Sequence, residues 1–108
     1  MQHVRLFRRK KQPIAGVREA DSADVKHLAE FVRTRTGVEA YLEPRTTVTA
    51  TTVVLIASDG EWTRRRVDGP EGAAAFAHKH AIPLYETELV GYPQRMRDWN
   101  ARQKRATE

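Results

Sequence analysis

Residues 51–67 carry the sequence TTVVLIASDGEWTRRRV, the stretch that decides the fold. The β-branched run that ends in this stretch begins at Thr46, and such stiff side chains favour strands over helices. The pair Asp59-Gly60 is typical of a two-residue type I′ hairpin turn. The sequence therefore predicts two antiparallel strands, over 46–57 and 61–67, joined at that turn.

A two-residue loop also fixes which residues of the two strands face one another. The predicted pairs are Ser58 with Glu61, Ala57 with Trp62, Leu55 with Arg64 and Val53 with Arg66. Cross-strand partners share a face of the sheet, so Trp62, Arg64 and Arg66 should lie together beside Leu55. We expect helices to cover the opposite face, which carries Val54 and Ile56, and to leave the Trp62 face more open.

The remaining patterns complete one α+β domain. Alternating apolar residues predict a strand over 38–43, and 82–86 is typical of a short strand that Pro83 confines to an edge. Helices are predicted over 22–36, from Asp68 or Gly69 to just before Pro83, and over 93–103. The order α-β-β-β-α-β-α indicates a single-domain, mainly antiparallel sheet with the helices packed on one face.

Apolar stripes indicate which sides of the helices are buried. In the first helix the inward stripe is predicted as Val25, Leu28, Ala29 and Val32, widened by Phe31, and in the second as Ala73, Phe76, Ala77 and His80. The last helix is very polar, and its predicted anchors are Met96 and Trp99. Such a helix is either stabilised by a partner or is a frayed end docked through those two side chains.

Charge divides the chain of 108 residues into a basic irregular arm (1–20), a core (21–92) and a basic C-terminal helix and tail (93–108). The net charge is +5, from 19 basic and 14 acidic side chains. Residues 1–18 hold six basic side chains and no acidic one, whereas residues 19–90 hold more acidic than basic ones. Basic ends attract polyanions, although the same ends also suit a solvated tail that aids solubility.

Candidate nucleic-acid contacts follow from this distribution, because guanidinium groups grip phosphates and aromatic rings stack on bases. They are Arg5, Arg8, Arg9, Lys10 and Lys11 in the arm, Trp62, Arg64 and Arg66 on the sheet, and Arg95, Arg97 and Arg102 in the last helix. Tyr41 is expected near the sheet group. The alternative is that Trp62 packs on Ala57 while the arginines pair with Glu39, Glu43 or Glu61.

The sequence contains no local catalytic or cofactor motif. It has no cysteine, its six glycines form no phosphate-binding loop, and His78 and His80 would point to opposite sides of a helix. We therefore expect no cofactor and no metal. No apolar run is long enough to span a membrane, and the basic N-terminus lacks the apolar core of a secretory signal, which predicts a cytoplasmic protein without membrane contact.

Four stretches carry a family resemblance: PIAGVREA (13–20), EPRTTVT (43–49), GEWTRRRV (60–67) and GYPQRMRD (91–98). They resemble a small family of uncharacterised actinobacterial proteins, which implies a bacterial compartment and no particular activity. The α-β-β-β-α order over 22–80 also resembles the double-stranded-RNA-binding domain. In that domain lysines begin the second helix, whereas here it begins Pro70-Glu71-Gly72, so the resemblance is one of topology.

The leading interpretation is a non-catalytic RNA-binding or ribonucleoprotein-associated module that uses its basic ends and the Trp62 face. The main alternative is a protein–protein adaptor or homodimer, because the short strand at 82–86 leaves a sheet edge that could recruit a partner strand. A third alternative is a small enzyme without a local motif.

Overall fold

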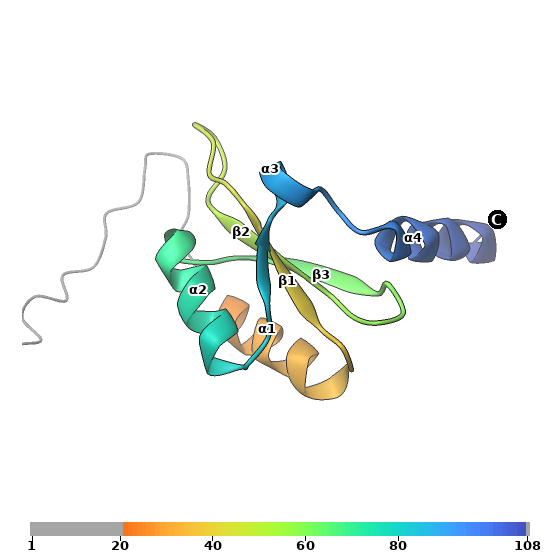
Figure 1. The fold of residues 1–108 in the computed structure, drawn as a ribbon, viewed down its shortest axis with the longest axis horizontal. Coiled ribbons are helices and arrows are strands. Elements are labelled where there is room, and N and C mark those ends of the chain that lie inside the picture. The colour runs from red at the N-terminus through yellow and green to blue at the C-terminus, as the bar shows by residue number, and fades with distance from the viewer. Residues whose placement is uncertain (1–20, 108) are drawn as a thin grey trace, which may run out of the picture.

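A computed structural model describes residues 21–107 (Figure 1). Its elements in chain order are α1 (Ser22–Thr34), β1 (Glu39–Glu43), β2 (Thr52–Ile56), β3 (Trp62–Arg66), α2 (Gly69–Lys79), β4 (Leu84–Glu86), α3 (Thr87–Val90) and α4 (Gln94–Thr107). The predicted single α+β domain and its element order are confirmed. The short helix α3 was not predicted, because four residues are too few to show a helical period.

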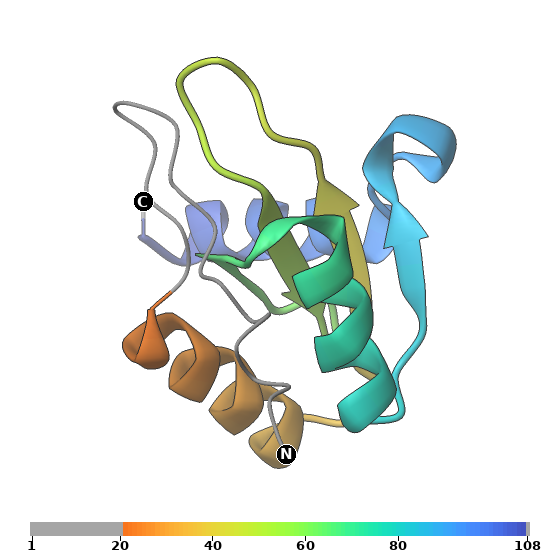
Figure 2. The same cartoon turned by 90° about the vertical axis from the view of Figure 1, so that its left-hand side faces the viewer.

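The sheet has the strand order β3-β2-β1-β4. β2 is antiparallel to both β1 and β3, and β4 runs parallel to β1 at the edge of the sheet. The sheet is therefore mainly antiparallel, as predicted. The second strand is shorter than the predicted 46–57, because residues 44–51 form the loop that joins β1 to β2 at the top of Figure 2, exposed over 44–49.

The predicted register of the β2–β3 hairpin is wrong by one residue. Leu55 pairs with Thr63 and Val54 with Arg64, so Ser58-Asp59-Gly60 is a three-residue loop rather than the two-residue Asp59-Gly60 turn. The Ala57 N–H donates to the Glu61 carbonyl, and Gly60 has φ +95°. This is the geometry of a type I turn closed by a glycine bulge, in which an Asp-Gly pair fits equally well.

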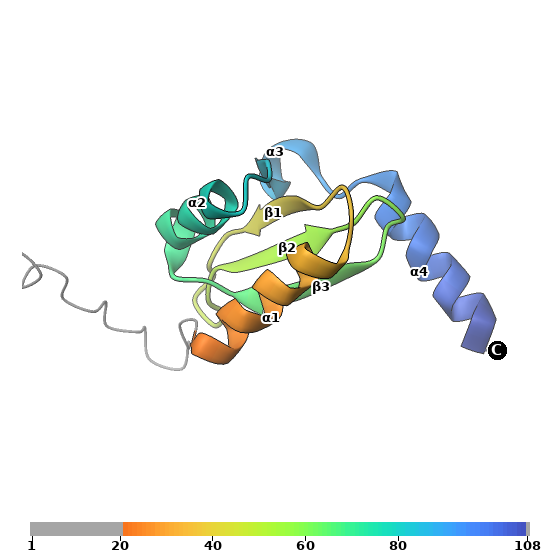
Figure 3. The same cartoon turned by 90° about the horizontal axis from the view of Figure 1, so that it is seen from below.

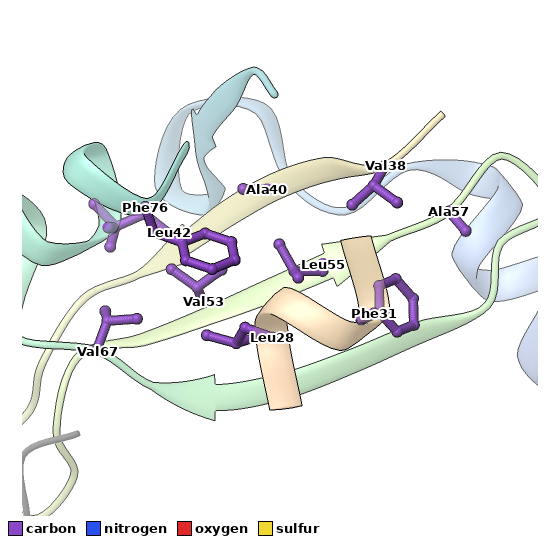
Figure 4. Close-up of a cluster of buried hydrophobic side chains, with 11 residues drawn as sticks. Leu28, Phe31, Val38, Ala40, Leu42, Val53, Leu55, Ala57, Val67 and Phe76 are labelled. Atoms are coloured by element: carbon purple, nitrogen blue, oxygen red, sulfur yellow. The ribbon is translucent and has the colours of Figure 1, made fainter. Parts of the chain in front are cut away.

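Helices α1 and α2 cover the opposite face from the predicted one, and α4 packs on the other face, so the helices do not all lie on one face as predicted. Figure 2 shows α1 and α2 in front of the sheet and α4 behind it. The main core lies under α1 and α2 and includes Leu28, Phe76, Val53 and Leu55, as Figure 4 shows. Because the register and the covered face both differ from the prediction, Trp62 and Arg64 still lie on the face that α1 and α2 leave open.

Helix α1 begins with a capping box, since the Asp21 side chain accepts from the Asp24 N–H and the Asp24 side chain accepts from the Asp21 N–H. Its buried line runs through Asp24, Leu28 and Phe31. The predicted stripe is therefore wrong at Val25, which is 48% exposed. The helix lies along β3, where His27 and Thr63 are hydrogen-bonded, and this contact turns the Asp24 side inward.

Helix α2 buries Ala73, Phe76 and Ala77, as predicted, while His80 is its C-cap and stacks on Phe76. The last helix, α4, extends beyond the predicted 93–103 to Thr107 and leaves the sheet at the hairpin end, as Figure 3 shows. Among the described residues, no helix is long and apolar enough to cross a membrane.

Candidate nucleic-acid interface

The face that carries Trp62, Arg64 and Arg66 has a small core of its own. Tyr41, Val54, Ile56 and Met96 are buried on it, and Trp62 and Tyr92 pack against them. Val54 and Ile56 have no solvent exposure. The centre of the Trp62 face is therefore not open to solvent, because Met96 of α4 and the segment before α4 cover it.

Arg64 is held by Glu43 on this face. The Arg64 Nε donates to Glu43 Oε1 at 2.8 Å and its second nitrogen donates to Oε2 at 2.9 Å, a bidentate pair between β3 and β1. The hydroxyls of Thr52 and Tyr92 also donate to the Glu43 carboxylate. Burial opposes ionisation of Glu43, but these hydrogen bonds outweigh it, and the pKa of Glu43 lies below its usual value.

Arg95 makes the second such network, at the other end of β1. Its Nε donates to the Ala57 carbonyl at 3.0 Å, and its terminal nitrogen pairs with Glu39. The Tyr41 hydroxyl donates to the same carboxylate. Burial and the Glu39 carboxylate together raise the pKa of Tyr41. Arg95 therefore joins the start of α4 to two strands and is a structural contact in this conformation.

Trp62 is half-buried between Arg64 and α4. The Arg64 guanidinium lies 5.2 Å from the centre of the indole ring, and the indole N–H donates to Asn100 Oδ1 at 2.7 Å. The predicted alternative for Arg64, pairing with Glu43, is what the structure contains. Arg66 lies on the same face and makes no ion pair or side-chain hydrogen bond with the described part of the chain.

Gly60 lets α4 approach this closely. The residue is buried, and a Cβ placed on it would lie 2.1 Å from the Arg95 carbonyl oxygen and 2.9 Å from the Trp99 Cβ. The φ of +95° also disfavours any residue with a side chain. Gly60 thus forms the hairpin turn and also allows α4 to pack against it, a second role that the sequence pattern did not indicate. We call this contact of α4 with the hairpin and the sheet the seat of α4.

The second half of α4 has no such contacts with the body. Every residue from 101 to 107 is exposed, and Arg102 is the one that touches the hairpin, donating to the Asp59 carbonyl at 2.8 Å. Arg97, Lys104 and Arg105 lie within one stripe on the side of the helix away from Trp99, because Lys104 and Arg105 follow Arg97 by about two helical turns. Arg97 bonds to the neutral acceptors Gln94 Oε1 and the Tyr92 carbonyl. None of the three cations of this stripe forms an ion pair with a carboxylate of residues 21–107.

The predicted arm contacts Arg5, Arg8, Arg9, Lys10 and Lys11 lie outside the described residues. Of the six predicted contacts that are described, Trp62, Arg64 and Arg66 lie on one face of β3, Arg95 pairs with Glu39 from the start of α4, and Arg97 and Arg102 lie on the exposed part of α4. The sequence also places Lys104 and Arg105 in this basic helix, and the structure adds them to the exposed stripe that contains Arg97.

A polar groove lies between α1 and the hairpin, lined by His27, Arg35, Glu61 and Thr63 among others. Its polar groups satisfy one another, since Arg35 pairs with Glu61 and His27 bonds to Thr63 at 2.6 Å. Burial, Arg65 and Arg35 lower the pKa of His27. Within residues 21–107, no three His, Cys, Asp or Glu side chains are grouped so that they could hold a metal ion.

No family model, curated protein or solved structure matches the chain. We therefore infer the function from the geometry and charge of the chain's own residues.

Proposed function

We propose that the protein binds RNA, and that the exposed basic stripe of α4 (Arg97, Lys104 and Arg105) makes the main phosphate contacts. The observation that carries the proposal is that all three side chains are exposed without an ion pair within residues 21–107, and that Lys104 and Arg105 lie on a helix half with no apolar anchor. Arginine predominates in α4, and arginine-rich segments are a recurrent device for RNA. A cytoplasmic location, as the sequence predicts, would give access to such a ligand.

The two arginines that pair with carboxylates of β1 have a different part in this proposal. Arg64 and Arg95 are neutralised by Glu43 and Glu39, so a phosphate would have to displace a bidentate or bridging carboxylate to reach them. We therefore assign them to the seat of α4, which holds the basic stripe in a fixed direction. Arg102 and the arm cations Arg5, Arg8, Arg9, Lys10 and Lys11 add further attraction in the proposal.

The test compares two double variants with the same change in net charge. Lys104→Glu with Arg105→Glu reverses the stripe, and Lys26→Glu with Lys79→Glu reverses two exposed lysines on α1 and α2. Binding to a fluorescently labelled single-stranded RNA is measured by anisotropy over a salt series that starts at roughly 50 mM. A DNA strand of the same sequence is the comparison ligand.

For the stripe variant we expect a loss of about ten- to hundredfold in affinity, since two charge-assisted contacts are removed. The salt dependence should also become shallower, by about 0.7 in log–log slope for each lost contact. The α1/α2 variant should stay within about threefold, because its charges lie away from the stripe. Equal losses in both variants, or no binding by the unaltered chain, would contradict the proposal, and tighter binding to DNA would reassign the ligand.

A further inference from the structure

The edge of the sheet formed by β4 and α3, residues 84–90, has a composition unlike the rest of the surface. β4 is an outermost strand of the sheet and pairs with β1. The hydrogen bond from the Ala40 N–H to the Pro83 carbonyl shows which backbone groups of β4 point toward β1. In a strand, alternate residues direct their backbone groups to opposite sides, so the N–H groups of Leu84 and Glu86 point away from β1. The edge thus offers backbone donors to another segment.

Apolar side chains are concentrated along this β4–α3 edge. Five large apolar residues of the described chain are exposed, and three of them are Tyr85, Leu89 and Val90. Leu89 is 79% exposed, although it lies within helix α3. Tyr85 contacts Tyr41 with one face, at a ring distance of 5.3 Å, so this patch continues the apolar surface of the sheet. Exposed apolar patches of this kind mark surfaces that bind another segment.

The edge is also acidic. Glu86 and Glu88 are both exposed, and no lysine or arginine occurs between Lys79 and Arg95. Neither carboxylate forms an ion pair within the described residues. A second copy of the chain, paired edge to edge, would bring like charges together, which disfavours that occupant. The chemistry instead fits a segment that is both apolar and cationic.

The chain contains such a segment at residues 4–11, VRLFRRKK. Val4, Leu6 and Phe7 are apolar, and the other five residues are cationic. No other stretch of the chain combines large apolar residues with so many cations. In composition it complements the β4–α3 edge in both respects.

The position of α1 puts this segment within reach of the edge. Arg65 contacts Asp24 near the start of α1, and the pairs Arg65–Val53, Val53–Leu42 and Leu42–Glu86 run straight across the sheet from there. Three strand spacings amount to about 14 Å. The ten Cα–Cα steps from position 11 to Asp21 can span about 33 Å when extended. Residues 4–11 can therefore reach Glu86 of their own chain, even though α1 lies above the sheet.

We propose that residues 4–11 bind along the β4–α3 edge of the same chain, with their apolar side chains against Tyr85, Leu89 and Val90 and their cations beside Glu86 and Glu88. The proposal is independent of RNA binding, and its test contains no nucleic acid.

The full chain has no cysteine, so a single Gln2→Cys substitution accepts a nitroxide label at one position. Amide signals are then compared with the label oxidised and reduced. We expect the signals of residues 84–90 to lose most of their intensity when the label is oxidised. The loop at 46–49 is the internal control, because Val48 is 74% exposed and no acidic residue occurs between Glu43 and Asp59.

The charge test uses the same label in two further double variants. Glu86→Lys with Glu88→Lys should restore the signals of residues 84–90, whereas Asp68→Lys with Asp98→Lys changes the net charge equally and should leave the loss in place. Attenuation absent from 84–90, or equal at 46–49, would overturn the proposal. Attenuation seen when a labelled, isotope-free chain is mixed with an unlabelled, isotope-enriched one would also overturn it, since the contact would then join two copies.

Discussion

Replacing Gly60 by alanine should lift α4 off the sheet. The new Cβ would lie 2.1 Å from the Arg95 carbonyl oxygen and 2.8 Å from its carbon. These are backbone atoms at the start of a helix, so no side-chain rotation can relieve the overlap. The hairpin or α4 has to move, and α4 is the element with fewer contacts.

The free-energy cost of this movement follows from what α4 covers. Exposing Met96, which is 7% exposed in the folded protein, costs about 1.5–3 kcal/mol. The Trp62–Asn100 and Arg102–Asp59 hydrogen bonds contribute about 1 kcal/mol each when they are lost. We therefore expect the seat of α4 to account for about 3–5 kcal/mol of the free energy of unfolding.

Gly91→Ala is the matched control. Gly91 has φ +70° and ψ −170°, so alanine there is strained by about 1–3 kcal/mol, but its Cβ would meet no atom within 4 Å. Denaturant unfolding should show that Gly60→Ala costs about 3 kcal/mol more than Gly91→Ala, an excess that reports the steric term. Both tryptophans of the chain lie at this contact, so their fluorescence should shift in Gly60→Ala alone. Equal losses of stability with unchanged emission would refute the reasoning.

Two further variants test the networks beneath the site and the core. The folded-state pKa of Glu43 lies below its usual value. Its contribution to the free energy of unfolding is therefore present above about pH 4.5 and is lost as the pH falls through the folded pKa. Glu43→Gln should reduce this acid-dependent loss of stability more than Glu30→Gln, which changes an exposed ion pair. Leu55→Ala should lower the free energy of unfolding by about 2–5 kcal/mol, whereas Leu89→Ala should change it by less than about 0.5 kcal/mol in the same denaturation series.

The sequence was sufficient for every element except α3, because the signals of the others are local. The Asp21 cap, the Pro70 start and the β-branched strand all act within a few residues. The hairpin register was not determined in this way. An Asp-Gly pair suits a two-residue turn and the last two positions of a three-residue loop, and the choice between them flips every side chain of β3.

The covered face could not be predicted for a related reason. Val53 and Leu55 occupy one side of β2, and Val54 and Ile56 occupy the other, so this central strand is equally apolar on both. Which side receives α1 and α2 depends on their contacts with β3 and β1, and those contacts are set by the register. The predicted site was affected in the same way, because the partner of Arg64 depends on which residues lie across from β3.

Folding separates the charges of the chain more than their order in the sequence suggests. Several arginines of the body are neutralised by nearby carboxylates, as Arg35 is by Glu61 and Arg64 by Glu43. Arg95 of α4 pairs with Glu39 and so neutralises one more carboxylate of the acidic core. Positive charge then remains on the exposed stripe of α4. Negative charge remains on Glu86 and Glu88 at the β4–α3 edge, where the chain has no lysine or arginine between Lys79 and Arg95. Both proposals follow from this one partition, and they draw on the same arm cations. Contacts of the arm with the edge therefore compete with contacts of the arm to RNA, while the α4 stripe is free to bind in either case.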